Sequence, residues 1–239
     1  MSNMTVKELR QWEDILLSFM STRMDGDGAH DMGHLYRVLR MARRIANAEG
    51  AHDPLTLLAA CMTHDLVNVP KDSPFRSKAS VLSADSAIEV LRDMGFPERC
   101  MDGVHHAVCA HSFSAKITPT TPEARALQDG DRLDALGAIG IARCFTVGGS
   151  LGRAPFDQTD PLGKARPMDE LQWSMDHFSV KLLGLRDTMT TRTGRDIALE
   201  RTNFLRLFMS RVNAECCGMT LDMEDKDETS LSGYCVPLK

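Results

Sequence analysis

A histidine and an aspartate stand side by side at His64-Asp65, directly after the apolar run 55–62. A run that is apolar almost all round indicates a buried helix, so both side chains are expected at the end of a helix in the core. The two side chains point about 100° apart on a helix and both reach an ion that lies over the edge between them. An imidazole and a carboxylate delivered together in this way are suited to bind one metal ion.

Two further metal ligands are predicted on other helices. His34 lies one turn before Val38 on the apolar line of its helix. Asp131 shares a face with Leu127 and Ala135, so its carboxylate points into the core, where burial is costly without a cation or many hydrogen bonds. Two imidazoles and two carboxylates suit manganese, iron, cobalt, nickel or zinc, whereas calcium, which takes only oxygen ligands, is disfavoured.

Each of these residues also has an ordinary interpretation. A lone helical histidine is more often a core or surface residue than a ligand, and a His-Asp pair alone is common. A buried aspartate such as Asp131 is more often a helix cap or an ion-pair partner. The ordered set favours the metal site, because its three parts fall on the inner faces of different predicted helices.

Basic residues could handle the charge of a phosphorylated substrate. Lys71 and Arg76 lie in a polar loop just after the His-Asp pair and are predicted to bind substrate, since the loop is close to the metal ligands along the chain. A solvated basic loop is the alternative. Lys181 shares a helix face with His177 and is predicted to bind substrate from the C-terminal side, with a surface pair as the alternative.

Two more histidines are candidates for the active site. His106 is predicted to bind substrate, and His111 is predicted both to bind substrate and to protonate the leaving group. Ligation of a second metal ion is a further role left open for them. Asp65 is assigned a catalytic role in addition to metal ligation.

Four polar residues are expected to support the ligands rather than to bind the ion themselves. Ligand-orienting hydrogen bonds of this kind fix the ring of a histidine and the tautomer that it adopts. The four residues are His30, Asp31, Asn68 and Asp134.

Helical periodicity runs through most of the chain, and no stretch alternates apolar and polar residues as a strand does. The expected helices cover 5–24, 29–47, 53–68, 84–95, 97–110, 121–147, 169–190 and 194–216, with a long loop over 148–169 as a lid or an insertion. We therefore predict an all-α fold with one domain over residues 1–218. Its metal-binding core covers about 29–147, extra helices follow, and residues 219–239 form an acidic tail.

Composition limits the partners. The net charge of -5 and the pI of 5.9 argue against binding to polymeric nucleic acid, which requires a basic surface. No apolar run approaches the roughly 18 residues that span a bilayer, so no membrane partner is expected. The seven cysteines are odd in number and show no CxxC spacing, which indicates reduced thiols. A cytoplasmic location is expected.

The ordered motifs carry a resemblance to a known family. The matching stretches are 30–38, 64–68 with 70–74, 110–114 and 128–140, and the similarity continues through 177–183 to Arg195. With these motifs the chain resembles the HD-domain superfamily of metal-dependent phosphohydrolases, whose pattern is H…HD…D on a helical fold. Within it, the chain is most similar to a bacterial branch that includes nucleoside triphosphate pyrophosphohydrolases.

The resemblance implies the metal ligands and also shows two departures. Gly130 stands where the branch usually has alanine, which weakens a helix by roughly 1 kcal/mol without removing a ligand. Asn68 stands where the deoxynucleotidase branch has a glutamate, and an asparagine cannot act as a general base. The family's four metal ligands carry over to His34, His64, Asp65 and Asp131.

The sequence thus predicts a divalent-metal-dependent phosphohydrolase that acts on a small phosphorylated metabolite, with a nucleotide as first choice. Family resemblance alone favours pyrophosphohydrolysis of a (deoxy)nucleoside triphosphate to the monophosphate and pyrophosphate. A nucleotidase, a cyclic nucleotide phosphodiesterase, a non-catalytic nucleotide-binding sensor and a di-iron oxygenase are the alternatives. Manganese is the first choice of ion, with magnesium, cobalt, nickel, iron and zinc as alternatives, and a homodimer is left open.

Overall fold

The fold is helical throughout the part of the chain that the computed structural model describes, which is residues 5–23, 31–67, 69 and 76–219. Within these ranges an isolated β-bridge joins Ala154 to Trp173, and no strand is present. The predicted all-α fold is confirmed.

Some of the expected features fall outside the described residues. They are His30, Asn68, Lys71 and the acidic tail beyond Met219. The roles predicted for these residues stay predictions.

The described residues gather in two compact units. The first comprises Met1–Asp134 and Met189–Asp196, and the second comprises Ala135–Thr188 and Ile197–Lys239. The predicted metal-binding core over 29–147 begins in the first unit and ends in the second. The expectation of one domain over residues 1–218 stays a prediction.

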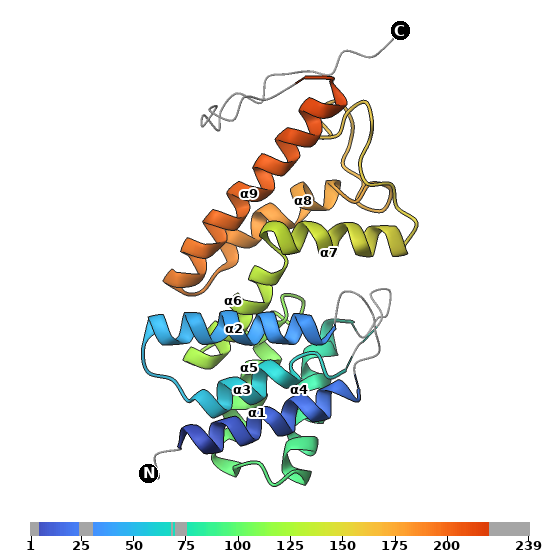
Figure 1. The fold of residues 1–239 in the computed structure, drawn as a ribbon. Helices are drawn as coiled ribbons and strands as arrows, with labels where there is room; N and C mark the ends of the chain where they lie inside the picture. The colour runs from blue at the N-terminus through green and yellow to red at the C-terminus, as the bar shows by residue number, and fades with distance from the viewer. Residues whose placement is uncertain (1–4, 24–30, 68, 70–75, 220–239) are drawn as a thin grey trace. The chain divides into compact units, whose positions relative to one another are not determined.

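Helix α3 lies at the centre of the first unit (Figure 1). Every residue of α3 from 55 to 63 is buried, and this helix contacts α1, α2, α5 and α6. The elements of the first unit are α1 (Val6–Ser21), α2 (Met32–Glu49), α3 (Pro54–Thr63), η1 (Arg76–Lys78), α4 (Ala79–Asp93), η2 (Glu98–Cys100), α5 (Met101–His111) and α6 (Pro122–Asp134), together with the first turn of α9 (Arg192–Cys216).

Two predicted helix starts are confirmed by their caps. The Thr5 hydroxyl accepts the backbone N–H of Glu8, and the Glu8 carboxylate accepts the backbone N–H of Thr5 at 2.7 Å. The Asp53 carboxylate accepts the backbone N–H groups of Leu55 and Thr56, with Pro54 in the first turn. These caps fix where the α1 and α3 backbones begin.

Helix α3 ends earlier than expected. Its last residue is Thr63 rather than a residue near Asn68, so His64 and Asp65 lie in a turn just beyond the helix. The cause is local: Nδ1 of His64 lies 2.8 Å from the Cys61 carbonyl oxygen, and a tight turn follows in which the N–H of Leu66 donates to Thr63. The His64 side chain thus satisfies a carbonyl group at the helix end.

The helix expected over 121–147 is also divided. Helix α6 ends at Asp134 and α7 (Gly137–Ser150) begins after a break. Gly137 has a φ of 70°, a left-handed conformation that a residue with a side chain adopts at a cost. Helical periodicity continues across the break, which is why the sequence pattern alone joined the two helices.

The second unit packs around aromatic side chains. It holds α7, α8 (Asp176–Val180), η3 (Leu182–Thr188) and the rest of α9 (Figure 1). The ring of Phe178 lies 5.8 Å from that of Phe145 and 6.1 Å from that of Phe208. Within the expected 148–169 loop, the guanidinium of Arg166 stacks on Trp173 and pairs with the buried Asp176 at 2.6 Å.

Most of the cysteines that the structure describes are reduced, as expected. Burial raises the pKa of Cys61 and Cys109, which keeps these thiols protonated. Cys217 differs from the expectation because it is disulfide-bonded. The free cysteines are Cys61, Cys100, Cys109, Cys144 and Cys216.

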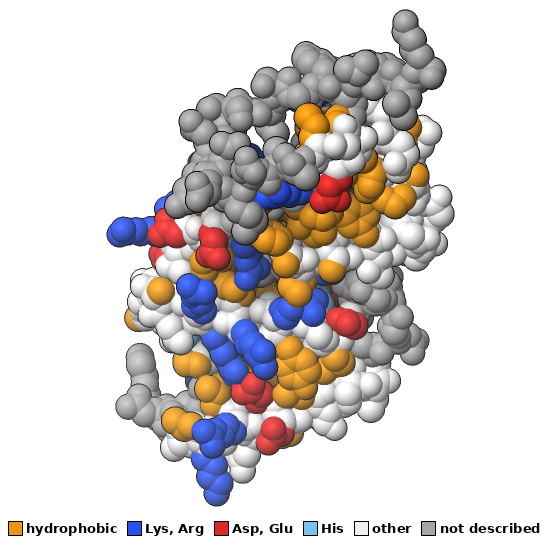
Figure 2. Space-filling model, turned by 45° about the horizontal axis from the view of Figure 1, so that its top comes forward, with side chains coloured by type: hydrophobic (Ala, Val, Ile, Leu, Met, Phe, Trp, Pro, Cys, Tyr) orange, Lys and Arg blue, Asp and Glu red, His pale blue; other side chains and the backbone are white. Residues whose placement is uncertain are grey.

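The described helices and one face of the surface bear on the requirements for membrane and nucleic-acid partners. No helix in the described ranges is long and apolar enough to cross a bilayer. Figure 2 shows lysine and arginine side chains lying among apolar and acidic ones on one face of the molecule. Binding of polymeric nucleic acid stays excluded by composition alone, as a prediction.

A buried carboxylate in α6 holds the start of α9. Asp129 is fully buried and accepts hydrogen bonds from the backbone N–H and the hydroxyl of both Thr190 and Thr191. Gly194 lies directly against this carboxylate. The first unit is thereby closed by a residue only two positions from the predicted ligand Asp131.

We expect the Gly194→Ala substitution to destabilise the protein by about 1–3 kcal/mol, because a methyl group at this position would collide with the Asp129 carboxylate. The loss occurs although alanine has the higher helix propensity. The free energy of unfolding from urea titration measures it. Gly149→Ala is the matched control, since nothing lies within 4 Å of a Cβ there. Equal stability of both variants would contradict this account.

Candidate metal centre

His64 presents an imidazole nitrogen with a lone pair inside the first unit. Its side chain is fully buried, and Nδ1 donates to the Cys61 carbonyl, so Nε2 carries the lone pair. Within the described ranges this buried Nε2 has no hydrogen-bond partner. Burial lowers the pKa of His64, while the Asp65 carboxylate acts in the opposite direction. A neutral, buried and unsatisfied imidazole nitrogen is suited to bind a metal ion.

His34 is oriented by a carboxylate. Its Nδ1 lies 2.8 Å from Oδ2 of Asp134. Arg37 donates from Nε to Oδ1 of the same carboxylate at 2.7 Å and from a second guanidinium nitrogen to Oδ2 at 3.1 Å. The Asp31 carboxylate caps α2 by accepting the backbone N–H of His34 at 2.8 Å. These contacts turn Nε2 of His34 toward Asp131, whose Oδ1 lies 3.5 Å away. A carboxylate that holds a histidine in this way is common at metal sites.

The ligand atoms of three residues converge. One ligand atom each from His34, His64 and Asp131 lies within 4.8 Å of the others. Oδ2 of Asp65 lies 3.5 Å from Nε2 of His64 and 3.9 Å from Nε2 of His34. Metal–ligand bonds of about 2.0–2.2 Å separate neighbouring ligand atoms by roughly 3.0–3.6 Å. The residues therefore fit a single ion after small adjustments.

The cluster is buried on one side and open on the other. The side chains of His34 and His64 are 1% and 0% exposed, whereas those of Asp65 and Asp131 are 30% and 29% exposed. A substrate oxygen and water can therefore approach from the carboxylate side. An open coordination position of this kind distinguishes catalytic from structural metal sites.

His111 lies at the edge of the cluster. Its Nδ1 donates to the Val108 carbonyl at 2.6 Å, and its Nε2 lies 3.5 Å from Oδ1 of Asp65. Burial alone would lower the pKa of His111, but the nearby Asp65 carboxylate outweighs burial and the net pKa is raised. The position of His111 beside Asp65 is compatible with the proton donor expected from the sequence, and this role stays a prediction.

The other predicted site residues lie in different surroundings. Nε2 of His106 receives the backbone N–H of Thr120 at 3.0 Å, so this ring anchors the loop that precedes α6. Arg76 begins η1, and Lys181 belongs to the second unit. Their predicted contacts with a substrate stay predictions.

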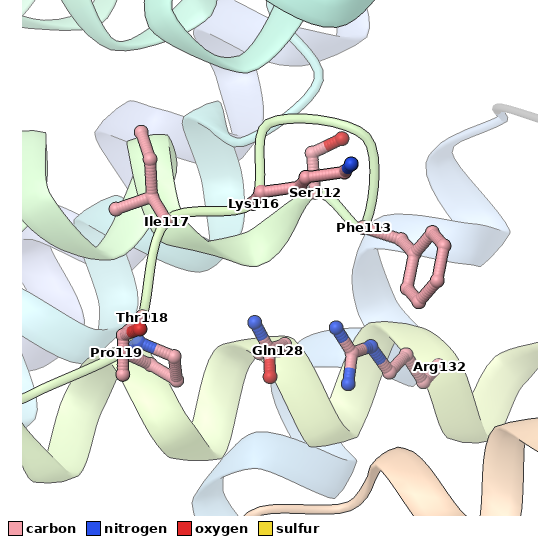
Figure 3. A pocket seen from close by; sticks show the side chains of 8 residues that line it. All are labelled: Ser112, Phe113, Lys116, Ile117, Thr118, Pro119, Gln128 and Arg132. Carbon is pink, nitrogen blue, oxygen red and sulfur yellow. The ribbon is translucent and has the colours of Figure 1, made fainter.

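A pocket that sequence reasoning did not anticipate lies near the cluster. It is bounded by the loop after His111 and by α6, and Figure 3 shows Phe113 and Arg132 at one end of it. A signal for Arg132 was present in the sequence, since it directly follows Asp131. Phe113 belongs to one of the motifs that carried the family resemblance, but nothing in its spacing indicated a pocket.

Comparison with known proteins places this geometry in a family. The model of the HD domain matches residues 32–136, a range that contains all four predicted ligands. An uncharacterised protein of Bacillus subtilis, YpgQ, is 34% identical over 218 residues, which cover 90% of this chain and 98% of YpgQ. The chain belongs to the HD-domain superfamily. The HD-domain assignment makes it a metal-dependent hydrolase of the phosphohydrolase type.

Solved structures of HD-domain proteins share the fold. YpgQ of Bacillus subtilis in complex with ADP has a TM-score of 0.66 at 30% identity, over 85% of this chain and 97% of YpgQ. An HD-superfamily hydrolase from Bacillus thuringiensis has a TM-score of 0.66 at 28% identity, over 87% of this chain and 97% of its own. The predicted superfamily is confirmed.

We expect His64→Ala to lower the affinity for Mn²⁺ by more than about 100-fold, since even residues that only orient ligands contribute 10- to 100-fold. Calorimetric titration of the metal-free protein measures the change. His105→Ala is the control, because this imidazole is 41% exposed and pairs with Asp85 at 3.0 Å. Unchanged Mn²⁺ binding by His64→Ala would remove this residue from the ligand set.

A milder change tests the orientation of His34. Asp134→Asn keeps the shape of the side chain but removes the charge that holds His34 and Arg37, so we expect Mn²⁺ affinity to fall by about 10-fold. Glu13→Gln is the control, because it removes a carboxylate that accepts two hydrogen bonds from the guanidinium of Arg43, away from the metal cluster. Equal affinities for both variants would show that Asp134 acts only on stability.

Proposed function

We propose that this HD-domain hydrolase cleaves a nucleoside triphosphate, releasing the monophosphate and pyrophosphate, with an ion held by four residues. The observation that supports the site is the buried Nε2 of His64, which faces a cluster open on its carboxylate side. An unsatisfied buried nitrogen is destabilising unless the site binds a ligand. The proposed ligands are His34, His64, Asp65 and Asp131.

The reaction is a displacement at the α-phosphorus. A water molecule releases one proton to the solvent and its oxygen forms a bond to this phosphorus. The bond between the α-phosphorus and the bridging oxygen breaks, and pyrophosphate leaves with the electron pair. A divalent ion in such a cluster supplies the activation of water and the polarisation of a phosphoryl oxygen. In our proposal Asp65 orients the attacking water, and His111, whose Nε2 lies 3.5 Å from Asp65, donates a proton to the leaving group.

The choice of a nucleotide is supported by a relative. YpgQ has been crystallised with ADP, which has a nucleoside and a pyrophosphate bridge in common with the proposed substrate. The choice of a triphosphate and of pyrophosphate as product follows the family resemblance of the motifs. A nucleotidase or a cyclic nucleotide phosphodiesterase would use the same ion and differ in the bond that breaks.

We propose manganese as the working ion. Two imidazoles with two carboxylates form a mixed set of nitrogen and oxygen ligands, which suits the borderline divalent ions. Magnesium, cobalt, nickel, iron and zinc are the alternatives that a metal panel separates. A cytoplasmic location and a homodimer remain proposals from the sequence.

The test is incubation of the purified protein with Mn²⁺ and a panel of nucleotides, followed by separation of the products. We expect a monophosphate and pyrophosphate in equal amounts, and we expect Asp65→Ala to lower kcat/KM by at least about 100-fold. Asp85→Ala is the control, because its carboxylate is 60% exposed on α4.

The products distinguish the alternatives. Inorganic phosphate from monophosphates would indicate a nucleotidase, and opening of a cyclic nucleotide would indicate a phosphodiesterase. Thermal stabilisation by nucleotides without any product would indicate a sensor. Absence of both turnover and stabilisation would refute nucleotide chemistry at this site.

A further inference from the structure

A pocket of about 290 Å³ lies between α6 and the loop that joins α5 to α6. Figure 3 shows the loop residues on one side and Gln128 and Arg132 of α6 on the other, with Phe113 directed toward the Arg132 end and Ile117 directed away from α6. All of its walls belong to the first unit. The lining residues are Ser112, Phe113, Lys116, Ile117, Thr118, Pro119, Gln128 and Arg132.

The pocket is connected to the metal cluster through two pairs of neighbouring residues. Ser112 follows His111, which lies 3.5 Å from Asp65, and Arg132 follows the predicted ligand Asp131. The half-buried Arg132 also interacts electrostatically with Asp131, although burial lowers its pKa. The Arg132 end of the pocket is therefore the end toward the metal cluster.

The walls away from Arg132 combine aliphatic and polar side chains. Ile117 and Pro119 line the loop side, and Gln128 lies one helical turn before Arg132 on α6. The amide of Gln128 is held by a 2.6 Å hydrogen bond to the Ala110 carbonyl. The pocket thus carries a guanidinium beside Phe113 at one end, and aliphatic groups together with Lys116 and Thr118 further away.

The loop keeps its shape through contacts at its C-terminal end and through an uncommon backbone conformation. His106 accepts the N–H and the hydroxyl of Thr120, and Nε of Arg125 donates to the Pro119 carbonyl at 3.3 Å. Lys116 has a φ of 54°, which is uncommon for a residue with a side chain. Strained conformations of this kind are retained where the surroundings fix them, and they cluster at ligand sites.

We propose that this pocket binds the nucleobase end of the substrate, with the base against Phe113 and the phosphates running past Arg132 to the metal cluster. Phe113 leaves 63% of its surface exposed, so its ring is available for stacking. Arg132 lies 5.8 Å above the same ring and would meet both the base and a phosphate. The inference rests on the proposed function and specifies where its substrate lies.

Size and polarity favour a base over an anion alone. A pocket of about 290 Å³ lies just below the range for sites that hold a whole small molecule, so it accommodates part of a nucleotide and leaves the phosphates outside. Ile117 and Pro119 offer no hydrogen bond to a phosphate, and burying a charged group against them would be costly. A planar ring system gains from the same walls.

The test compares two probes that differ only in the organic part. One is the α,β-imido analogue of dATP, in which the bond proposed to break is resistant, and the other is inorganic tripolyphosphate. Binding of both in the presence of Mn²⁺ is measured by calorimetry. We expect Phe113→Ala to weaken binding of the analogue by about 5- to 150-fold, the range for loss of a stacked base. The effect on tripolyphosphate is expected to be smaller by at least about fivefold.

Two further variants complete the design. Phe204→Ala removes an aromatic side chain that is 46% exposed on α9, outside the pocket, and is the matched control. Ile117→Asp places a carboxylate on the apolar wall and should weaken the analogue more than tripolyphosphate. Equal changes for both probes, or none, would overturn the base-binding pocket. Because the readout is binding, failure of turnover alone would overturn the proposed reaction and leave the pocket standing.

Discussion

The burial of a neutral imidazole nitrogen is the constraint on which this fold depends. His64 ends the most buried helix, and its Nδ1 is used to satisfy the Cys61 carbonyl, so Nε2 remains directed into the cluster. Leaving such a nitrogen without a partner costs about 1–3 kcal/mol. The surrounding helices make the arrangement useful rather than merely costly, because α2 and α6 bring His34 and Asp131 to the same place. The buried nitrogen lowers the stability of the fold, and the same arrangement places the metal ligands close together before an ion binds.

Helix α6 carries out three tasks with three carboxylates spaced along it. Asp129 holds the start of α9, Asp131 faces the imidazoles, and Asp134 orients His34. The close approach of α6 to α2 depends on Gly130, since a Cβ there would lie 3.1 Å from a backbone nitrogen of α2. Gly130 lowers the helix propensity of α6, and the close packing of α6 against α2 explains why a glycine stands there. One helix couples the closing of the unit to the position of the ligands.

Much of the fold follows from local signals that the sequence shows directly. The caps at Thr5 and Asp53 are chemical patterns of three or four neighbouring residues, and both helices begin where these patterns predict. The helix ends were less accessible. The end of α3 is set by a side chain that turns back to its own helix, and the break before Gly137 is set by a backbone conformation. Neither the end of α3 nor the break before Gly137 changes the hydrophobic periodicity of the sequence.

The candidate site also has a part that the sequence indicates, the metal cluster, and a part that it does not, the pocket. The metal cluster could be proposed from the sequence because its members are chemically distinctive, because His34 and Asp131 fall on helices, and because His64 and Asp65 directly follow a buried helix. The pocket could not be predicted from the sequence, because Phe113 and Arg132 line a common pocket only after the loop has folded over α6. Residue type alone suggested that His106 binds substrate, whereas its ring accepts a hydrogen bond from Thr120 and holds that loop. The metal ligands belong to the helical core, whereas the pocket is formed by a loop. The sequence of the loop can therefore change without moving the ion, which would let the same chemistry act on different organic groups.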